Sequence, residues 1–164
     1  MITQIRIGQG LDVHAFEDGR NYVTLAGVEI PHTAGLKAHS DGDVVLHALT
    51  DALLGALALG DIGQHFPDTD PKYKGADSRI LLKDAYQLIL DRGYQLSNAD
   101  ITIACERPKL AAYNLQMRQS IADVLNVDVM QISIKATTTE KLGFTGRQEG
   151  ILSMASVLIA HHVK

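Results

Sequence analysis

Hydrophobic and polar residues follow two periods along this chain, one typical of strands and the other typical of helices. Apolar residues that alternate with polar ones, as Ile101 and Ile103 do with Thr102, indicate a strand with one buried face. This alternation predicts extended segments over residues 5–16, 22–30, 94–105, 131–136 and 151–161. Apolar residues spaced three and four apart predict helices over residues 43–59, 78–92 and 112–125.

Capping and breaking residues set the ends of these segments. Pro31 is expected to end the second strand, because proline cannot donate to a strand ladder. Side-chain oxygens that accept from the first turn of a helix are the usual caps, and glycine is the usual stop. The first helix therefore has Ser40 or Asp41 as its expected cap and Gly60 as its stop, and the second has Asp77 or Ser78 and Gly93.

The order of the elements indicates the fold class. Strand, strand, helix, helix, strand, helix, strand, strand is typical of an α/β (α+β) domain with two layers, in which a mixed sheet carries helices mainly on one face. We expect a ferredoxin-like arrangement of one domain over residues 1–164. The helix over residues 43–59 is apolar on every side, so it should be buried in the core or against another subunit.

Composition excludes several classes of protein. With 164 residues, 46% hydrophobic and 21% charged, the chain is large enough to bury one core. A net charge of −4 argues against general binding of nucleic acid, which needs a basic face. The one cysteine, Cys105, cannot form an internal disulfide or a thiolate metal cage. No signal-peptide core or membrane-spanning run occurs in the sequence, so we expect a cytoplasmic protein that does not enter a membrane.

Asp12, His14 and His47 are the strongest chemical signal. On a strand, Asp12 and His14 point to the same face, and a helix can bring His47 from another direction. Two imidazoles and a carboxylate suit a divalent metal such as zinc, with a fourth position open to substrate. The alternative is that these histidines make ordinary hydrogen bonds. Asp51, one helical turn after His47, either orients that histidine or lies on the helix surface or at an interface.

Three other polar segments have two interpretations each. Residues 61–63 and 66–70 are small and acidic, which favours turns, although a flap that closes over a polar substrate is the alternative. Residues 137–141 could supply hydroxyls to phosphate and a carboxylate to a hard cation such as Mg²⁺, or could be a β-branched strand end. Arg147 could form a phosphate fork or be an exposed charge.

Common nucleotide and hydrolase signatures are absent from the sequence. Gly8-Gln9-Gly10 is followed by Val13 where a dinucleotide fold needs a third glycine. The sequence has no G-K-[ST], no G-x-S-x-G and no adjacent His-Asp pair.

Five segments, in order, resemble the 2-C-methyl-D-erythritol 2,4-cyclodiphosphate synthase family of the non-mevalonate isoprenoid pathway. The likeness extends over nearly the whole chain, and its last segment is long enough to be highly specific. The segments are Gly8-Gln9-Gly10-Leu11-Asp12-Val13-His14, Ala38-His39-Ser40-Asp41-Gly42-Asp43-Val44, Gly60-Asp61-Ile62-Gly63, Phe66-Pro67-Asp68-Thr69-Asp70-Pro71, and residues 135–147 from Lys135 to Arg147.

The resemblance implies a set of site residues. Metal ligands are implied at Asp12, His14 and His47, usually for zinc, and at Glu140 for Mg²⁺ or Mn²⁺. His39 and Thr138 are implied to stabilise the transition state. Contacts around the metal and phosphates would come from Asp12, Val13, His14, His39 and Ser40. Contacts to the methylerythritol part and from the adjoining loop would come from Asp61, Ile62, Gly63, Phe66, Pro67, Asp68, Thr69 and Asp70. A cytidine pocket would be formed by Cys105, Glu106, Arg107, Pro108, Lys109, Leu110 and Ala111 with Ala136, Thr137 and Thr138, and the remaining contacts would come from Thr139, Glu140, Phe144 and Arg147.

The family resemblance also implies a reaction and an assembly. The substrate would be the small cytidyl diphosphate 4-diphosphocytidyl-2-C-methyl-D-erythritol 2-phosphate, whose 2-phosphate attacks its own β-phosphorus and expels CMP. The assembly would be a homotrimer with active sites between subunits, which would also explain the apolar helix, and an isoprenoid phosphate could occupy the trimer centre. Two rival classes remain open, a metal-dependent phosphohydrolase and a non-catalytic trimeric carrier.

Overall fold

The computed structural model describes residues 2–162, which form one mixed sheet with helices against it. The five-stranded sheet has the order β4-β1-β7-β5-β6. Its strands are β1 (Ile2–Glu17), β4 (Gly35–Leu36), β5 (Tyr94–Ala104), β6 (Ile132–Thr137) and β7 (Gly150–His162). β1 and β5 both pair antiparallel with β7, and β6 pairs parallel with β5. The mixed sheet is therefore confirmed.

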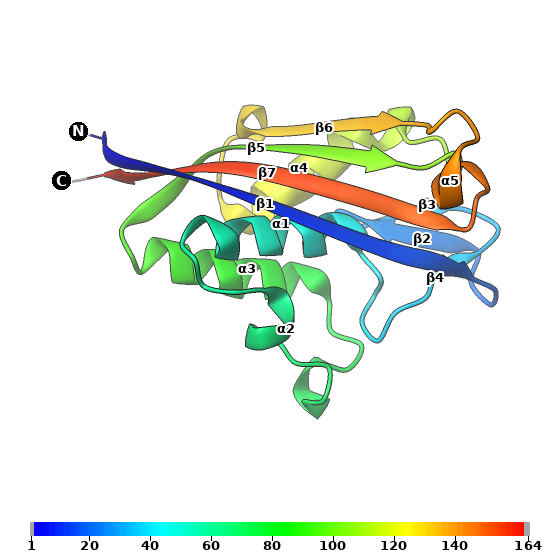
Figure 1. Cartoon of the computed structure of the whole chain (residues 1–164), viewed down its shortest axis with the longest axis horizontal. Coiled ribbons are helices and arrows are strands. Elements are labelled where there is room, and N and C mark those ends of the chain that lie inside the picture. The colour runs from blue at the N-terminus through cyan, green and yellow to red at the C-terminus, as the bar shows by residue number, and fades with distance from the viewer. Residues whose placement is uncertain (1, 163–164) are drawn as a thin grey trace.

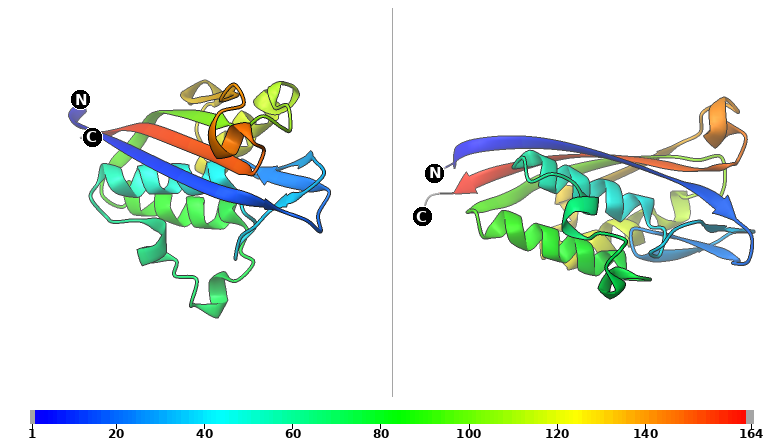
Figure 2. Two further views of the ribbon diagram at one scale, coloured as in Figure 1. Left: turned by 45° about the vertical axis from the view of Figure 1, so that its right-hand side comes forward. Right: turned by 60° about the horizontal axis from the view of Figure 1, so that its bottom comes forward.

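Three longer helices lie on the same side of the sheet (Figures 1 and 2). They are α1 (Val44–Ala56), α3 (Ser78–Leu90) and α4 (Asn114–Leu125). Shorter elements are α2 (Ile62–His65), α5 (Gly143–Gly146) and the 3-10 turns η1 (Pro71–Tyr73), η2 (Ala111–Tyr113) and η3 (Val129–Gln131). The expected two-layer domain is confirmed. Within residues 2–162, none of the helices has the length and apolar character that crossing a bilayer requires.

The single strand predicted over residues 22–30 is wrong, because the chain reverses within it. The structure has a hairpin, β2 (Tyr22–Leu25) paired with β3 (Val28–Pro31). Ala26 and Gly27 form its turn with φ of 53° and 75°. Their backbone N–H groups donate to the buried carboxylate of Asp43 at 2.9 and 2.7 Å. This distant acceptor fixes a turn that the local sequence does not signal.

The predicted ends of α1 also need correction. The helix begins after Asp43, whose side chain accepts from Leu46 N–H at 3.0 Å, and not after Ser40 or Asp41. It ends at Ala56, before Gly60, because Ala58 already has a left-handed φ of 54°. Burial raises the pKa of Asp43 to about 6, against the opposing effect of its backbone donors. Asp43 thus joins the start of α1 to the β2–β3 turn.

α1 is buried within its own chain, between the sheet and α3. A neighbouring subunit is therefore not needed to explain its apolar surface. Gly8 and Gly10 allow this helix to lie directly on β1, because a Cβ atom at these positions would meet the carbonyl oxygens of Ala52 and Ala48 at 1.9 and 2.0 Å. The two glycines therefore set the close approach of α1 that brings His47 to β1.

Candidate active site

Asp12, His14 and His47 converge as the sequence predicted. Asp12 and His14 lie on β1 with both side chains on the helix-covered face, and His47 lies in the first turns of α1. Asp12 Oδ2 is 3.0 Å from His14 Nε2 and 3.1 Å from His47 Nδ1. One ligand atom from each of the three residues lies within 4.8 Å of the others, a spacing that can surround a single metal ion.

The backbone of Lys37 fixes the tautomer of His14. His14 Nδ1 is 2.7 Å from Lys37 O, and because a carbonyl oxygen can only accept, Nδ1 carries the proton. The neutral ring then directs the lone pair of Nε2 toward Asp12. A metal-ligating histidine commonly has this arrangement, with its other ring nitrogen held by a carbonyl oxygen.

His47 is held by a different pair of groups. Its Nε2 lies 2.8 Å from Ser78 Oγ, whose own hydroxyl proton is donated to Asp41. Ser40 Oγ is a second neighbour of Nε2, at 3.3 Å. Asp51 does not hold His47 as one interpretation suggested, because its carboxylate accepts from Ile62 N–H at 2.7 Å. Asp51 instead ties α1 to the start of α2.

Three electron-pair donors therefore face one point. With the second nitrogen of each ring already donating, His14 Nε2, His47 Nδ1 and the Asp12 carboxylate all present lone pairs. Burial acts to raise the pKa of Asp12, but the hydrogen bonds with the two histidines outweigh it and lower the pKa. The hydrogen bond with Asp12 raises the pKa of His14 despite burial. A proton or a cation must lie between these atoms, so the donor set fits a divalent metal.

A cavity of about 460 Å³ opens from this cluster. It is bounded by β1, the segment before α1 and the segment that contains α2. Of the residues predicted to contact substrate, Asp12, His14, His39, Ser40, Ile62, Gly63, Phe66 and Asp68 line it; His47, a predicted metal ligand, also lines it. The remaining lining residues were not predicted: Glu17, Lys37, Ala38, Tyr73 and Leu81.

The segment 61–76 is held by turns of the kind that its composition favours. Asp61 caps α2 by accepting from Gln64 N–H at 3.0 Å, and Asp70 accepts from Lys72 N–H at 2.9 Å. Phe66 is buried against Tyr73 in an edge-on contact with ring centroids 5.4 Å apart. Residues 66–70 form turns as that interpretation expects, whereas Ile62 and Gly63 belong to the short helix α2, and the segment lies along the cavity.

Most of the other predicted contacts form a second group, away from the cavity. Five predicted contacts belong to neither group and do not line the cavity: Val13, Asp61, Pro67, Thr69 and Asp70. Within residues 2–162, none of the residues 105–111 or 136–147 lines the cavity. We call Asp12, His14 and His47 the metal half of the site, and residues 105–111 and 136–147 the threonine half. In Figure 1 the threonine half lies at the end of β5 and β6 and around α5, at the same end of the sheet as the hairpin. The structure of one chain thus separates the predicted site into two parts.

Glu106 joins the two segments of the threonine half. Its Oε1 accepts from the backbone N–H groups of Thr139 and Lys141, each at 3.2 Å. Cys105 N–H donates to Thr137 O at 3.0 Å, so the two segments are joined twice. Burial raises the pKa of the Cys105 thiol to about 11, which keeps it neutral. Cys105 is therefore suited to shape a pocket and unsuited to act as a thiolate.

The hydroxyls of the threonine half are not equally available. Thr139 Oγ1 donates to Leu142 O at 2.7 Å and so must accept from Thr145 Oγ1, also at 2.7 Å. Thr137 and Thr138 make only local bonds, at 3.0 Å to Thr138 O and at 3.2 Å to the Glu140 carboxylate. These two hydroxyls can turn to a ligand at little cost.

Two further predicted contacts are exposed. Arg147 pairs with Glu149 at 2.6 Å, and this neighbour raises the pKa of the guanidinium. The exposed-charge interpretation of Arg147 therefore describes this structure, in which 61% of its side chain is exposed. Glu140 is exposed, with a left-handed φ of 54°. Backbone strain of this kind is common at functional sites.

Sequence reasoning missed the groups that hold the two histidines. The Lys37 carbonyl has no sequence signal, because any residue supplies a backbone oxygen. Ser78 was visible only as a candidate helix cap, and Asp77 performs that role by accepting from Arg79 N–H at 2.9 Å. The one clue in the sequence was that Asp77 can cap this helix by itself, which leaves the Ser78 hydroxyl available to another partner.

Comparisons with known proteins identify the family of this chain. Residues 5–160 match the model of the YgbB family. The chain is 84% identical over 161 residues, 98% of this chain and 100% of the relative, to the 2-C-methyl-D-erythritol 2,4-cyclodiphosphate synthase of an Acinetobacter baumannii strain. It is 80% identical over 164 residues, the whole of both chains, to that of Acinetobacter baylyi.

The solved structures that match this chain include other 2C-methyl-D-erythritol-2,4-cyclodiphosphate synthases. A 2C-methyl-D-erythritol-2,4-cyclodiphosphate synthase in a CDP-bound form matches with a TM-score of 0.86 and 40% identity over 94% of this chain and 99% of that chain. The bifunctional IspDF from Campylobacter jejuni matches with a TM-score of 0.92 and 50% identity over 97% of this chain, which spans 43% of that protein.

Proposed function

This chain belongs to the YgbB family of 2-C-methyl-D-erythritol 2,4-cyclodiphosphate synthases, and we propose that it is a metal-assisted phosphorus–oxygen lyase. Its substrate is 4-diphosphocytidyl-2-C-methyl-D-erythritol 2-phosphate, and its products are the 2,4-cyclodiphosphate and CMP. The observation that carries the proposal is the convergence of the three lone-pair donors of the metal half at a polar cavity.

Asp12, His14 and His47 would hold a divalent metal, with Zn²⁺ as the expected ion. Glu140 would hold Mg²⁺ or Mn²⁺ together with substrate phosphates. Bound cations would supply positive charge that offsets the repulsion between the phosphates of the substrate. His39 and Ser40, at the wall of the cavity, would donate hydrogen bonds to phosphate oxygens.

The reaction needs no protein nucleophile. The 2-phosphate oxygen forms a bond to the β-phosphorus, the bond from that phosphorus to the CMP oxygen breaks, and the bonding pair leaves with CMP. The task of the protein is to hold a flexible polyanion so that the attacking and leaving oxygens are in line. Thr138 and His39 would stabilise the charge that develops on the transferring group. The buried, neutral Cys105 thiol agrees with this scheme.

Residues from the threonine half would bind the cytidine part and the remaining phosphate oxygens. Its two segments, residues 105–111 and 136–147, are joined by the bond from Thr139 N–H to Glu106 and by the bond from Cys105 N–H to Thr137 O. Two of the solved relatives are described as CDP complexes, which supports a cytidyl nucleotide as the ligand of this surface.

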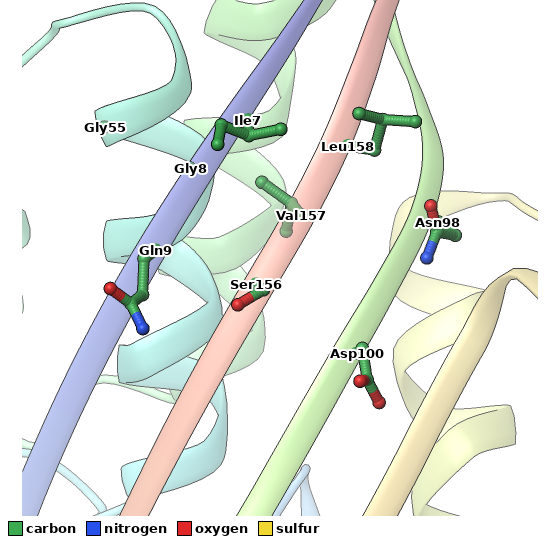
Figure 3. Close-up of a pocket in the computed structure, with 9 residues that line it drawn as sticks. All are labelled: Ile7, Gly8, Gln9, Gly55, Asn98, Asp100, Ser156, Val157 and Leu158. Atoms are coloured by element: carbon green, nitrogen blue, oxygen red, sulfur yellow. The ribbon is translucent and has the colours of Figure 1, made fainter.

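We propose a homotrimer with each active site shared between neighbouring subunits. The threonine half does not line the cavity of its own chain, so a second copy would have to bring it there. An apolar surface that could mediate the contact lies on the open face of the sheet, where Ile5, Ile7 and Leu11 are 63%, 78% and 54% exposed. A hollow of about 650 Å³ is formed there by β1, β7 and β5, with Gly55 at its edge (Figure 3). An isoprenoid phosphate in the trimer centre would lie against this face.

Incubation of the protein with the cytidyl substrate, followed by phosphorus NMR, tests the proposal. We expect a cyclic diphosphate and CMP, and loss of both when a chelator is added. A linear phosphate product would instead indicate a phosphohydrolase, in which water attacks. Binding of isoprenoid phosphates without any release of CMP would indicate a carrier. Sedimentation analysis of the same sample tests the trimer, and the cytoplasmic location remains a prediction.

A further inference from the structure

We infer that Ser78 and Asp41 are positioning residues that fix the ring tautomer of His47, and so determine which of its nitrogens binds metal. This inference rests on the proposed function, because it assigns His47 as a ligand. It concerns two residues that belong to neither the metal half nor the threonine half.

The direction of the hydrogen bonds follows from the chemistry of each group. Asp41 is a carboxylate, so it must accept the hydroxyl proton of Ser78. With that proton committed to Asp41, the Ser78 oxygen can only accept from His47 Nε2, which lies 2.8 Å away. The Nε2 atom therefore carries the imidazole proton, and Nδ1 keeps its lone pair. Nδ1 is the nitrogen that faces Asp12 at 3.1 Å.

Asp41 is itself held in place by the backbone. Its two oxygens accept from Ser78 N–H at 2.8 Å and from Asp43 N–H at 3.1 Å. Ser78 is 1% exposed, so water does not readily replace its hydroxyl. The hydrogen bonds from His47 to Ser78 and from Ser78 to Asp41 link the starts of α1 and α3. The donor and the acceptor in each of these bonds are fixed. Partners of this kind typically change metal affinity by about 10–100-fold when they are removed.

Ser40 is the competing partner of His47 Nε2 and is the weaker candidate. Its Oγ is 3.3 Å from Nε2, and it has no carboxylate behind it to fix the direction of its proton. Its other bond, from Gly42 N–H, is 3.4 Å long. Loss of Ser78 would therefore leave Nε2 with a partner that can either donate or accept, and both tautomers of His47 would become populated.

The main test compares Ser78→Ala with two other variants. Ser78→Thr keeps a hydroxyl at the same position. Asp77→Ala removes the cap of the same helix, since Asp77 accepts from Arg79 N–H, but it leaves the chain from Asp41 to His47 intact. Asp41→Asn keeps the size of the side chain but introduces an amide that can donate to Ser78, so the direction of the chain is no longer fixed.

Two measurements are made on each variant. Long-range nitrogen–proton NMR of the metal-free protein reads the tautomer of His47, and competition titration reads the Kd for Zn²⁺. We expect Ser78→Ala to lose the Nε2–H tautomer and to bind Zn²⁺ roughly 10–100-fold more weakly. Asp41→Asn should show a smaller change in the same direction. Ser78→Thr should keep the Nε2–H tautomer of the parent. Asp77→Ala should change neither the tautomer of His47 nor the Zn²⁺ affinity.

The inference is wrong if Ser78→Ala keeps the tautomer and the Zn²⁺ affinity of the parent. It is also wrong if Asp77→Ala weakens Zn²⁺ binding as much as Ser78→Ala, because loosening of α3 would then be the cause. These outcomes are distinct from failure of the proposed function. A parent protein that neither binds Zn²⁺ nor forms a cyclic product would refute that function, while the NMR measurement would still decide the tautomer of His47.

Discussion

The metal half and the threonine half of this site are prepared for their ligands in different ways. In the metal half, three lone-pair donors face each other, and buried or backbone groups already hold the second nitrogen of each histidine. In the threonine half, the hydroxyls and Glu140 are bonded mostly to each other within one exposed loop. The donors of the first half already converge on one point, whereas the residues of the second do not line the cavity of their own chain.

This difference indicates what each half can do alone. Donors that are held in advance lose little side-chain freedom when they bind, so the metal half should bind its ion within a single chain. Loop groups that bond to each other must exchange those partners for a ligand, and in the trimer that we propose they would gain most from binding once substrate and a second subunit enclose them. We therefore expect the two halves to respond separately to substitution.

The largest effect is expected from His47→Ala. The variant removes one ligand from a site of three, so Zn²⁺ affinity should fall by more than the roughly 100-fold that loss of a second-layer partner costs, and CMP release should be lost. Competition titration and product analysis check this. Full CMP release with metal bound as tightly as in the parent would contradict the assignment of the metal half.

The next effect tests whether the close contact of α1 with β1 builds the metal half. Gly10→Ala places a Cβ atom 2.0 Å from Ala48 O, so α1 must move. We expect a loss of about 1–3 kcal/mol in the free energy of unfolding, and weaker Zn²⁺ binding.

Gly55→Ala is the matched control, because Gly55 lies inside α1 and its added Cβ atom would be 3.8 Å from its nearest neighbour, Gln9 O. It should stabilise the protein by about 0.5–1 kcal/mol and leave Zn²⁺ affinity unchanged. Chemical denaturation of both variants measures the difference. Equal effects from Gly10→Ala and Gly55→Ala would show that helix contact does not set the geometry of the site.

A third prediction concerns pH. The hydrogen bond with Asp12 raises the pKa of His14 above that of a free imidazole, and a metal must displace the proton held there. Zn²⁺ affinity should therefore fall as the pH is lowered through the neutral range, by at most about tenfold per pH unit for each proton displaced. Zn²⁺ titrations at about pH 8, 7 and 6 would measure this fall in affinity. An affinity that stays constant over this range would contradict the prediction.

The smallest effect is expected from Glu106→Gln. The amide keeps one acceptor for the N–H groups of Thr139 and Lys141 but lacks the charge, which should cost about 0.5–1.5 kcal/mol of loop stability. We expect a several-fold rise in KM for the cytidyl substrate with unchanged Zn²⁺ affinity. A change in Zn²⁺ affinity would show that the two halves are coupled within one chain.

Sequence patterns predicted most of the fold because most of it depends on local periodicity. Alternation located β5 and β7, and the cap Asp77 located the start of α3. The β2–β3 turn was missed because its stabilising acceptor, Asp43, is distant in sequence. The cap of α1 was misplaced because Ser40, Asp41 and Asp43 are all suitable residue types. Only tertiary contacts select among them.

The residue types and their order were enough to identify the family and to predict three side chains that could hold a metal, because ligand chemistry depends on side-chain identity. Tertiary structure alone decided that Ser78 rather than Asp51 holds His47, and that the threonine half does not line the cavity of its own chain. Such choices depend on distances of a few ångströms between atoms far apart in sequence, which no local pattern encodes.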